Sequence, residues 1–319
     1  MTVSILICSA GRRVGLSNAF RDAAQALGHK ARIIAVDVKP ALSAACALAD
    51  VAYAVPRASD PDYVSALVDL CDRERVQLVV PTIDHELLPL AMAVDLFGAV
   101  GARVHISSPD FVRMARDKEI TAKRLDAAGI ATPRTVTPLH TNVTHAAIDL
   151  PAIVKPRGGS SSIGLRVLRT RADLAGFELP ADSIVQELLD GPEYTVNVFY
   201  DAEGNFRAAI PHLRLETRGG EMSKGRTERH AALTEIARQI GKSAMGIRGA
   251  FCFQAILTTR GPVVFEINAR FGGGYPLAHH AGGRFAQWLL EEVLELERTA
   301  ADDWRPNITA LRYDMEVFR

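Results

Sequence analysis

Short apolar runs alternate with helix-like segments through the first third of the chain, and this alternation constrains the fold more than any other feature. Each run is rich in aliphatic and β-branched residues, as expected for a buried strand. The predicted strands cover residues 3–8, 32–37, 51–55, 77–81 and 103–106. Because strands separated by helices usually pair in parallel, we predict an open α/β domain with a parallel sheet over residues 1–106.

The rest of the chain, from residue 107 onward, has a different pattern in which strands follow one another more directly. Residues 193–200 and 206–213 flank a short polar turn and predict an antiparallel pair. Apolar residues at helical spacing predict a helix within 227–242, and a shorter helix is predicted at 117–128. Further strands are predicted at 151–155, 165–168, 183–188, 249–257 and 262–268. We therefore expect an α+β region after the α/β domain.

The charge balance excludes several classes of partner. The 319 residues contain 37 Lys and Arg against 37 Asp and Glu, so the formal net charge is zero. Proteins dedicated to nucleic acids or membrane surfaces usually depend on concentrated basic charge, so we expect neither partner. No apolar stretch approaches the roughly 18 residues of a membrane span, no secretory signal pattern is present, and the four cysteines lack metal-site spacing. We expect a cytoplasmic protein.

A lysine followed by a glycine- and serine-rich loop is the most specific chemical feature. Lys155 ends an apolar strand, and Gly158, Gly159 and Ser160–Ser162 follow it. Glycine amides and serine hydroxyls can surround a polyphosphate without obstruction from large side chains. The lysine precedes the glycines, so this is not a Walker loop. A flexible surface turn is the alternative interpretation.

A second polar pattern lies on the last predicted strand. Side chains alternate between the faces of a strand, so Glu266, Asn268 and Arg270 share one face, opposite the face of Phe265. If the preceding hairpin turns about Arg260, then Gln254 lies opposite Glu266. Carboxylate and amide oxygens beside nucleotide phosphates are ligands that Mg²⁺ accepts. Arg270 could stabilise a transferring phosphoryl group. A solvated strand face is the alternative.

Two weaker features concern nucleotide binding. Lys118 lies in the first turn of a helix, where the helix dipole disfavours a cation unless an anionic ligand is near. Residues Gln186, Glu187 and Leu188 end a strand just before a break, and Glu193 begins the next strand. Backbone groups at such a hinge can pair with an adenine edge, and an acid can bind ribose hydroxyls. A solvated lysine and an ordinary loop are the alternatives.

Candidate substrate residues are less specific. Gly11 lies in a strand-to-helix turn that could bind an anionic group, with help from Arg12 and Arg13, or a dinucleotide, or could be only a tight turn. Asp84 and Glu86 follow a parallel strand and could meet a cationic amine, or could cap a helix. Residues 214–229 could form a solvated mobile loop or a loop that closes on a substrate, with Lys224 as its best candidate.

Taken in this order and spacing, these segments resemble the ATP-grasp superfamily, and more closely its branch similar to the large chain of carbamoyl phosphate synthase. The resemblance spans essentially the whole chain. It implies a pre-ATP-grasp domain over 1–106, a central and lid subdomain over 107–187, and an antiparallel C-terminal subdomain over 188–319. At 319 residues, we expect one ATP-grasp unit with no room for the second half that carbamoyl phosphate synthesis requires.

The resemblance also implies residue roles. Lys118 and Lys155 would contact ATP phosphates, and Ser160–Ser162 would form a lid. Residues Gln186, Glu187 and Leu188 would meet adenine, and Glu193 would hold the ribose. The implied metal ligands are Gln254, Glu266 and Asn268, and Arg270 would contact the reacting phosphoryl group.

The implied cofactors are ATP and Mg²⁺, or Mn²⁺ in its place. The implied reaction activates a small-molecule carboxylate as an acylphosphate, which an amine attacks. The alternatives are a carboxylate or carbamate kinase similar to carbamoyl phosphate synthase, and a non-catalytic ATP-binding regulatory module. A homodimer is also expected.

Overall fold

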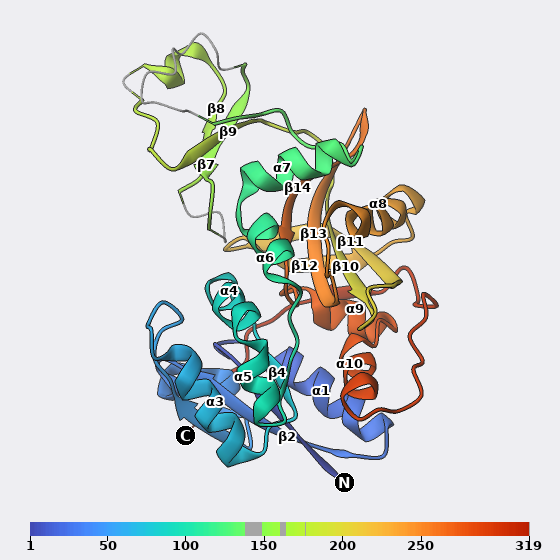
Figure 1. The fold of residues 1–319 in the computed structure, drawn as a ribbon. Helices are drawn as coiled ribbons and strands as arrows, with labels where there is room; N and C mark the ends of the chain where they lie inside the picture. Colours follow the sequence, from blue (N-terminus) through green and yellow to red (C-terminus); the bar gives the residue numbers. More distant parts are fainter. Residues whose placement is uncertain (138–148, 160–163, 176, 319) are drawn as a thin grey trace.

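The N-terminal third of the chain forms a five-stranded parallel sheet in the order β3-β2-β1-β4-β5 (Figure 1). Its strands are β1 (Thr2–Ile7), β2 (Lys30–Asp37), β3 (Val51–Ala54), β4 (Leu78–Val80) and β5 (Arg103–Val104). The connecting helices are α1 (Val14–Ala26), α2 (Ala44–Ala47), α3 (Tyr63–Glu74), α4 (Asp84–Met92) and α5 (Val94–Ala99), with a 3-10 turn, η1 (Pro40–Leu42). The predicted parallel sheet is therefore confirmed. The computed structural model describes residues 1–137, 149–159, 164–175 and 177–318.

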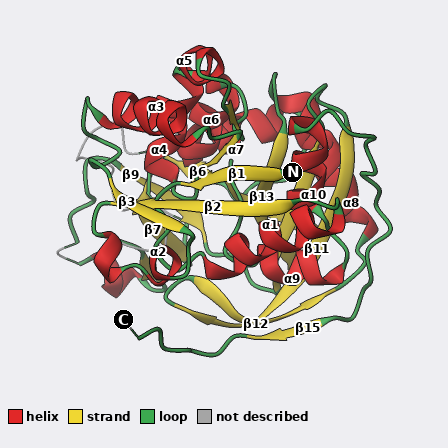
Figure 2. Cartoon of the chain, turned by 90° about the horizontal axis from the view of Figure 1, so that it is seen from below, coloured by secondary structure: helices red, strands yellow, loops and turns green. Residues whose placement is uncertain are grey.

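A six-stranded antiparallel sheet occupies the C-terminal part, in the order β14-β13-β10-β11-β12-β15. Its strands are β10 (Glu193–Tyr200), β11 (Phe206–Arg218), β12 (Glu221–Thr227), β13 (Gly249–Thr258), β14 (Gly261–Asn268) and β15 (Thr309–Leu311). The helices of this part are α8 (Ala231–Ser243), α9 (Tyr275–Ala281) and α10 (Phe285–Val293). Figure 2 shows β15 beside β12 at the edge of the sheet.

The segment 214–229 is not a loop. β11 continues to Arg218 and turns through Gly219 and Gly220 into β12, and α8 begins only at Ala231. The end of this hairpin is exposed on both faces, so its sequence lacks the apolar alternation that marks a half-buried strand. The prediction of a loop over 214–229 was wrong for that reason, whereas the helix predicted within 227–242 is present as α8.

A small four-stranded antiparallel sheet lies beyond helix α7 (Lys118–Ala127), at the end of the molecule away from the parallel sheet (Figure 1). Its order is β6-β9-β7-β8, and its strands are β6 (Thr135–Val136), β7 (Ala152–Pro156), β8 (Arg166–Leu168) and β9 (Ser183–Glu187). Helix α6 (Pro109–Arg116) precedes α7, and a 3-10 turn, η3 (Arg171–Leu174), follows β8. This sheet has a separate apolar cluster that includes Val154, Leu168 and Val185.

The two larger sheets share their apolar cores. One cluster combines Ile5 and Phe20 of the parallel-sheet region with Phe199 and Phe285 from the C-terminal part. Phe271 packs edge-on against Phe20, with ring centroids 6.0 Å apart, and lies 4.6 Å from the ring of Tyr275. The small sheet is therefore attached to a body in which the other two sheets are packed together.

The divisions at residues 107 and 188 stay predictions. None of the described helices combines the length and the apolarity needed to cross a bilayer.

Candidate active site

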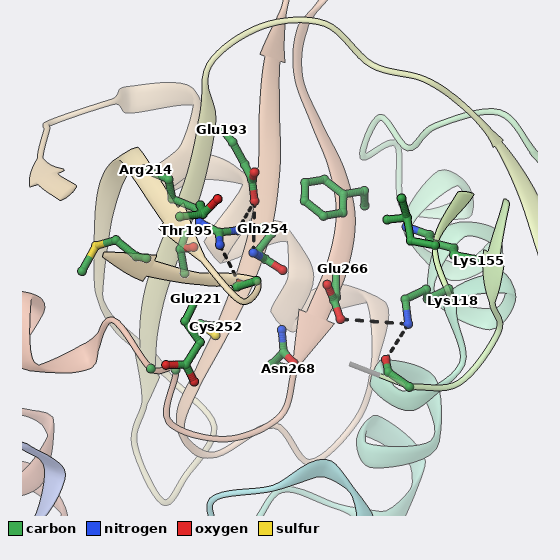
Figure 3. Close-up of a pocket in the computed structure, with 18 of the residues that line it drawn as sticks. Lys118, Lys155, Glu193, Thr195, Arg214, Glu221, Cys252, Gln254, Glu266 and Asn268 are labelled. Carbon is green, nitrogen blue, oxygen red and sulfur yellow. Dashed lines mark hydrogen bonds and ion pairs between the residues drawn. The ribbon is translucent and has the colours of Figure 1, made fainter. Parts of the chain in front are cut away.

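A cavity of about 400 Å³ lies where the three sheets meet. The turn before α4, the start of α7, strands β7 and β9, and five strands of the large sheet contribute to its lining. Figure 3 shows the two lysines on one side of the cavity, Glu193 and Arg214 on another, and Glu221 with Cys252 near Asn268. The structure thus gathers residues that are far apart in the sequence.

The two lysines are buried, and among the described residues their only carboxylate contact is the long one between Lys118 and Glu266. Lys118 Nζ donates to the carbonyl oxygen of Gly159 at 2.8 Å and lies 4.0 Å from Glu266 Oε1. Lys155 Nζ lies 5.3 Å from the centre of the Phe265 ring. Burial lowers the pKa of Lys155 to about 8. An anionic ligand would restore favourable surroundings to both cations.

The loop after Lys155 is described in part. Gly158 and Gly159 line the cavity, and Gly159 has a φ of +111°, a conformation that favours glycine over other residues. Ser160, Ser161 and Ser162 lie outside the described residues. Their predicted role as a lid stays a prediction.

The predicted pairing of Gln254 with Glu266 is present. β13 and β14 pair in the register that sets these two residues opposite each other, and Cys252 opposite Asn268. The prediction for Phe265 was wrong: the register shifts next to Gln254, so strict alternation ends and the Phe265 ring joins the cavity lining. Burial raises the pKa of Glu266, and Lys118 and Lys155 oppose this effect.

Arg270 is held by three groups at the same end of β14. Its Nη2 donates to Asn268 Oδ1 at 2.9 Å and contacts Asp84 Oδ2 at 3.1 Å, and its Nη1 donates to the Phe271 carbonyl oxygen at 3.1 Å. Burial is the largest single effect and would lower the pKa of Arg270, but Asp84, Cys252 and Glu266 together outweigh it and the pKa is raised. Arg270 Nε is buried and has no partner among the described residues.

Residues predicted to hold the nucleoside also line the cavity. Gln186, Glu187 and Leu188 belong to its wall at the end of β9, where the Leu188 amide donates to Pro151 O at 3.0 Å. Glu187 forms an ion pair with Arg260 at 2.6 Å. Glu193 accepts from Gln254 Nε2 at 3.2 Å and forms an ion pair with Arg214.

The donor set fits a nucleoside triphosphate with Mg²⁺. No cluster of three His, Cys, Asp or Glu side chains suited to a metal occurs in the described part of the chain. One carboxylate and two amides, on Glu266, Asn268 and Gln254, line the cavity beside the buried lysines. Mg²⁺ is commonly held by one or two carboxylates together with phosphate oxygens and water, so this sparse protein set matches that ion when phosphates are present.

The structure does not bring four predicted residues to the cavity. The Glu86 carboxylate is fully buried and accepts from Ser9 Oγ at 2.6 Å, from Tyr63 OH at 2.8 Å and from the Thr82 amide at 2.5 Å. Glu86 lies in the first turn of α4 and also accepts from the backbone amide of the N-cap residue, Ile83, at 3.0 Å. The structure therefore supports the capping alternative for Glu86, not contact with an amine.

The other three residues lie outside the lining. The Gly11 amide donates to Asp37 Oδ2 at 3.0 Å, which serves the turn itself. The Arg12 side chain is 79% exposed. Lys224 points to solvent on β12 and pairs with Glu216 at 2.8 Å, so the structure gives no support to its predicted catalytic role.

Several lining residues were not identified from the sequence. His212, Arg214 and Glu221 project into the cavity from the β11–β12 hairpin. Of the two arginines expected near an anionic group, Arg13 reaches the cavity and Arg12 does not. The only available signal for the hairpin residues was their charge, and the same segment contains many charged residues that face solvent. Asp84 does reach the cavity, where it contacts Arg270.

Two protein families match the chain. The family described as "PylC-like, N-terminal domain" matches residues 5–105, and the family described as "ATP-grasp domain" matches residues 115–274. Similar curated proteins are a D-alanine–D-alanine ligase from Marinomonas sp., 36% identical over 107 residues (30% of this chain and 32% of the ligase), and an N5-carboxyaminoimidazole ribonucleotide synthase from Mycobacterium bovis, 38% identical over 120 residues (35% and 28%). The matches therefore span about a third of the length of these relatives.

The fold is similar to that of an L-amino acid ligase from Bacillus licheniformis. The TM-score is 0.71 at 18% identity, covering 96% of this chain and 78% of the ligase. This likeness concerns the fold and confirms the predicted succession of a parallel sheet and the antiparallel sheets of the ATP-grasp fold. The ATP-grasp match alone covers half of the chain, and the chain belongs to the ATP-grasp family.

Proposed function

We propose that this protein is an ATP- and Mg²⁺-dependent ligase that activates a carboxylate as an acylphosphate and passes the acyl group to an amine. One observation carries the proposal: a single cavity contains two buried lysines, the Glu266 and Asn268 pair, and Arg270 at its edge. The similarity to a D-alanine–D-alanine ligase and to an L-amino acid ligase supports the same class of reaction.

The residues divide the proposed work between them. Lys118 and Lys155 bind the phosphates, and Gln186 to Leu188 and Glu193 hold the nucleoside. Glu266, Asn268 and Gln254 hold Mg²⁺, which supplies neutralisation of phosphate charge. Arg270 stabilises the charge that develops as the γ-phosphoryl group leaves ADP for a substrate carboxylate.

The second half of the reaction follows from the first. The amine attacks the carbonyl carbon of the acylphosphate, phosphate leaves, and the amine nitrogen loses a proton. Water would destroy the acylphosphate, so a site recessed between three sheets favours ligation over hydrolysis.

The direct test is ADP release by the full chain with ATP and MgCl₂, across a panel of carboxylic acids, bicarbonate and amines. Product formation that requires both an acid and an amine is the expected result, and Mn²⁺ is expected to replace Mg²⁺. Trapping of an acyl hydroxamate by hydroxylamine, with no product from any amine, would identify a carboxylate kinase instead. ADP release at background with every combination would contradict an enzymatic function.

Glu266→Gln tests the metal site. We expect turnover to fall by about 100-fold or more, because the change removes the carboxylate among the three proposed metal ligands. Nucleotide binding without Mg²⁺ should be retained. Glu216→Gln is the matched control, since Glu216 is 57% exposed and pairs with Lys224 outside the cavity. Equal rates in the wild type and Glu266→Gln would remove Glu266 from the metal site.

A cytoplasmic location, a homodimer and the absence of a nucleic-acid partner stay predictions.

A further inference from the structure

Buried nitrogens without partners are concentrated in the cavity. Five buried side-chain nitrogens have no hydrogen-bond partner within the described residues, and three of them belong to cavity-lining residues: His212, Arg214 and Arg270. A buried donor without a partner costs about 1–3 kcal/mol, so a ligand that accepts from it is favoured. Arg214 and Arg270 lie beside the proposed nucleotide and phosphoryl positions, but the proposed reaction leaves His212 without a role.

His212 presents a hydrogen-bond donor. Its Nδ1 lies 3.2 Å from Asn197 Nδ2, and an amide nitrogen can only donate, so Nδ1 accepts and the proton is placed on Nε2. Burial lowers the pKa of His212 to about 3, which keeps the ring neutral. The side chain is 0% exposed, and Nε2 is the atom without a partner. The Nε2–H group of His212 is therefore a neutral donor at the cavity wall without an acceptor among the described residues.

Arg13 presents a cation at the same place. Its closest polar contacts are long: Nη2 lies 3.5 Å from Thr82 O, and Nη1 lies 3.8 Å from Glu221 Oε1. Burial and the nearby positive charge of Arg270 lower the pKa of Arg13. These surroundings favour an anion next to the guanidinium group.

Two consecutive glycines keep the space beside both donors open. A methyl group at Gly273 would lie 3.1 Å from both Arg13 Nη1 and Glu221 Oε1, and one at Gly274 would lie 2.7 Å from His212 Nε2. Successive Cα atoms are about 3.8 Å apart, so the two donors border one small space. Any side chain at either glycine would fill it.

The fixed charges around this space favour an anion over an amine cation. Glu221 is close to Arg13 and accepts from Arg312 Nη1 at 2.8 Å, so its charge is already balanced. Asp84 is engaged by Arg270 at 3.1 Å, and Glu86 is buried elsewhere. Both Asp84 and Glu221, the described acids at this end of the cavity, therefore have a basic partner.

This space is distinct from the position of the reacting carboxylate. His212 belongs to β11, which lies three strands away from β14 in the sheet. At about 4.8 Å per strand, the two backbones are roughly 14 Å apart. A substrate whose reacting group lies against Asn268 and Arg270 therefore needs a second polar group to meet His212.

We propose that Arg13 and His212 bind a carboxylate of the substrate other than the one that is phosphorylated. The inference rests on the proposed ligase function and deepens it by naming a substrate class. The second carboxylate has two sources: the activated acid is then a dicarboxylate, or the attacking amine is an amino acid.

The test is binding to the full chain with ADP and MgCl₂, measured by titration calorimetry with matched pairs. Dicarboxylates from malonate to adipate are compared with monocarboxylates of the same length, and α-amino acids are compared with the amines that lack their carboxylate. We expect at least one member with the extra carboxylate to bind about 10-fold or more tightly than its partner, the usual effect of a charge-assisted hydrogen bond. Tighter binding of a dicarboxylate than of its monocarboxylate indicates that the activated acid carries the second carboxylate. Tighter binding of an α-amino acid than of its amine indicates that the attacking amine carries it.

Substitutions test whether Arg13 and His212 cause the tighter binding of ligands that carry the extra carboxylate. Arg13→Gln and His212→Phe should each abolish it, whereas Arg12→Gln, which changes the exposed neighbouring arginine, should keep it. If Arg13→Gln fails to fold by circular dichroism, His212→Phe decides the question. Preference that survives in the folded variants, or no preference in the wild type, would overturn the inference.

The two proposals can fail separately. ADP release with monocarboxylates and hydroxylamine, without preference for a second carboxylate, leaves the ligase proposal standing and overturns this inference. Selective binding that Arg13→Gln abolishes, without ADP release from any substrate, supports the carboxylate subsite and contradicts the ligase.

Discussion

Lys155 combines a charged function with a buried position. Its pKa is lowered from 10.5 to about 8 by burial, so the charged form is lost as the pH rises above 8. We predict that affinity for ADP, measured by titration between pH 7 and pH 9.5, falls by up to about 10-fold per pH unit above pH 8. Lys155→Arg should bind with little change over this range, because arginine stays charged. An identical pH profile in the two proteins would contradict the role of Lys155.

The same shift has a consequence for stability. The folded pKa lies below the unfolded one, so the unfolded chain binds more protons between about pH 8 and pH 10.5. The contribution of Lys155 to the free energy of unfolding therefore rises with pH through this window. The destabilisation by the buried charge is fully present below pH 8, the range in which we predict the highest affinity for ADP.

Adjacent residues show why the sequence predicts a site only in part. Glu266, Asn268 and Gln254 were found because strand alternation and hairpin register are readable from the chain. Arg12 and Arg13 are neighbours in one turn, and only the folded backbone decides that Arg13 faces the cavity. His212 carries no sequence signal of its own, because a buried histidine in a strand is ordinary until its unpartnered Nε2 is seen.

Elements were predictable where burial imposes a pattern. The strand expected at 193–200 has those bounds in β10, which is buried along most of its length. The hairpin between β11 and β12 was missed because its exposed end imposes no such pattern. The hairpin contacts residues that are distant in the chain, and the local periodicity of a sequence does not predict such contacts.

The short strand β15 provides one of those contacts. After it, Arg312 donates through Nη1 to Glu221 Oε2 at 2.8 Å and through Nη2 to the Gly273 carbonyl oxygen at 2.6 Å. Arg312 is thus a positioning residue for two walls of the proposed carboxylate subsite. The ion pair between Arg312 and Glu221 is partly exposed, so it should add at most about 1 kcal/mol to the free energy of unfolding.

We predict that Arg312→Ala raises the KM for the acid or amine substrate by about 10-fold, because Glu221 and Gly273 lose a shared donor. The ADP dissociation constant should stay unchanged, since the lysines lie on another side of the cavity. Steady-state kinetics and titration calorimetry separate the two effects. Arg218→Ala removes a neighbouring arginine, paired with Asp314, and serves as the control. Equal losses of nucleotide and substrate affinity would indicate a general structural defect.

At the scale of the whole molecule, the shared core joins the two larger sheets into one structural unit. Phe285 is fully buried, and its ring lies 5.4 Å from the rings of Phe199 and of Tyr275. We predict that Phe285→Ala lowers the free energy of unfolding by about 3–5 kcal/mol. Calorimetry should show one main transition moved to lower temperature. If the parallel sheet and the large antiparallel sheet melt separately, the shared core does not couple them.

The pairing of β15 with β12 also bears on how the protein is made. Synthesis proceeds from the N-terminus, and domains generally fold in that order. All the proposed nucleotide and metal ligands have been added to the chain once Arg270 has been added, whereas Arg312 is added after β15. A released chain that ends between these points contains every proposed nucleotide and metal ligand, but its Glu221 side chain and Gly273 carbonyl lack the donor that Arg312 provides in the full protein.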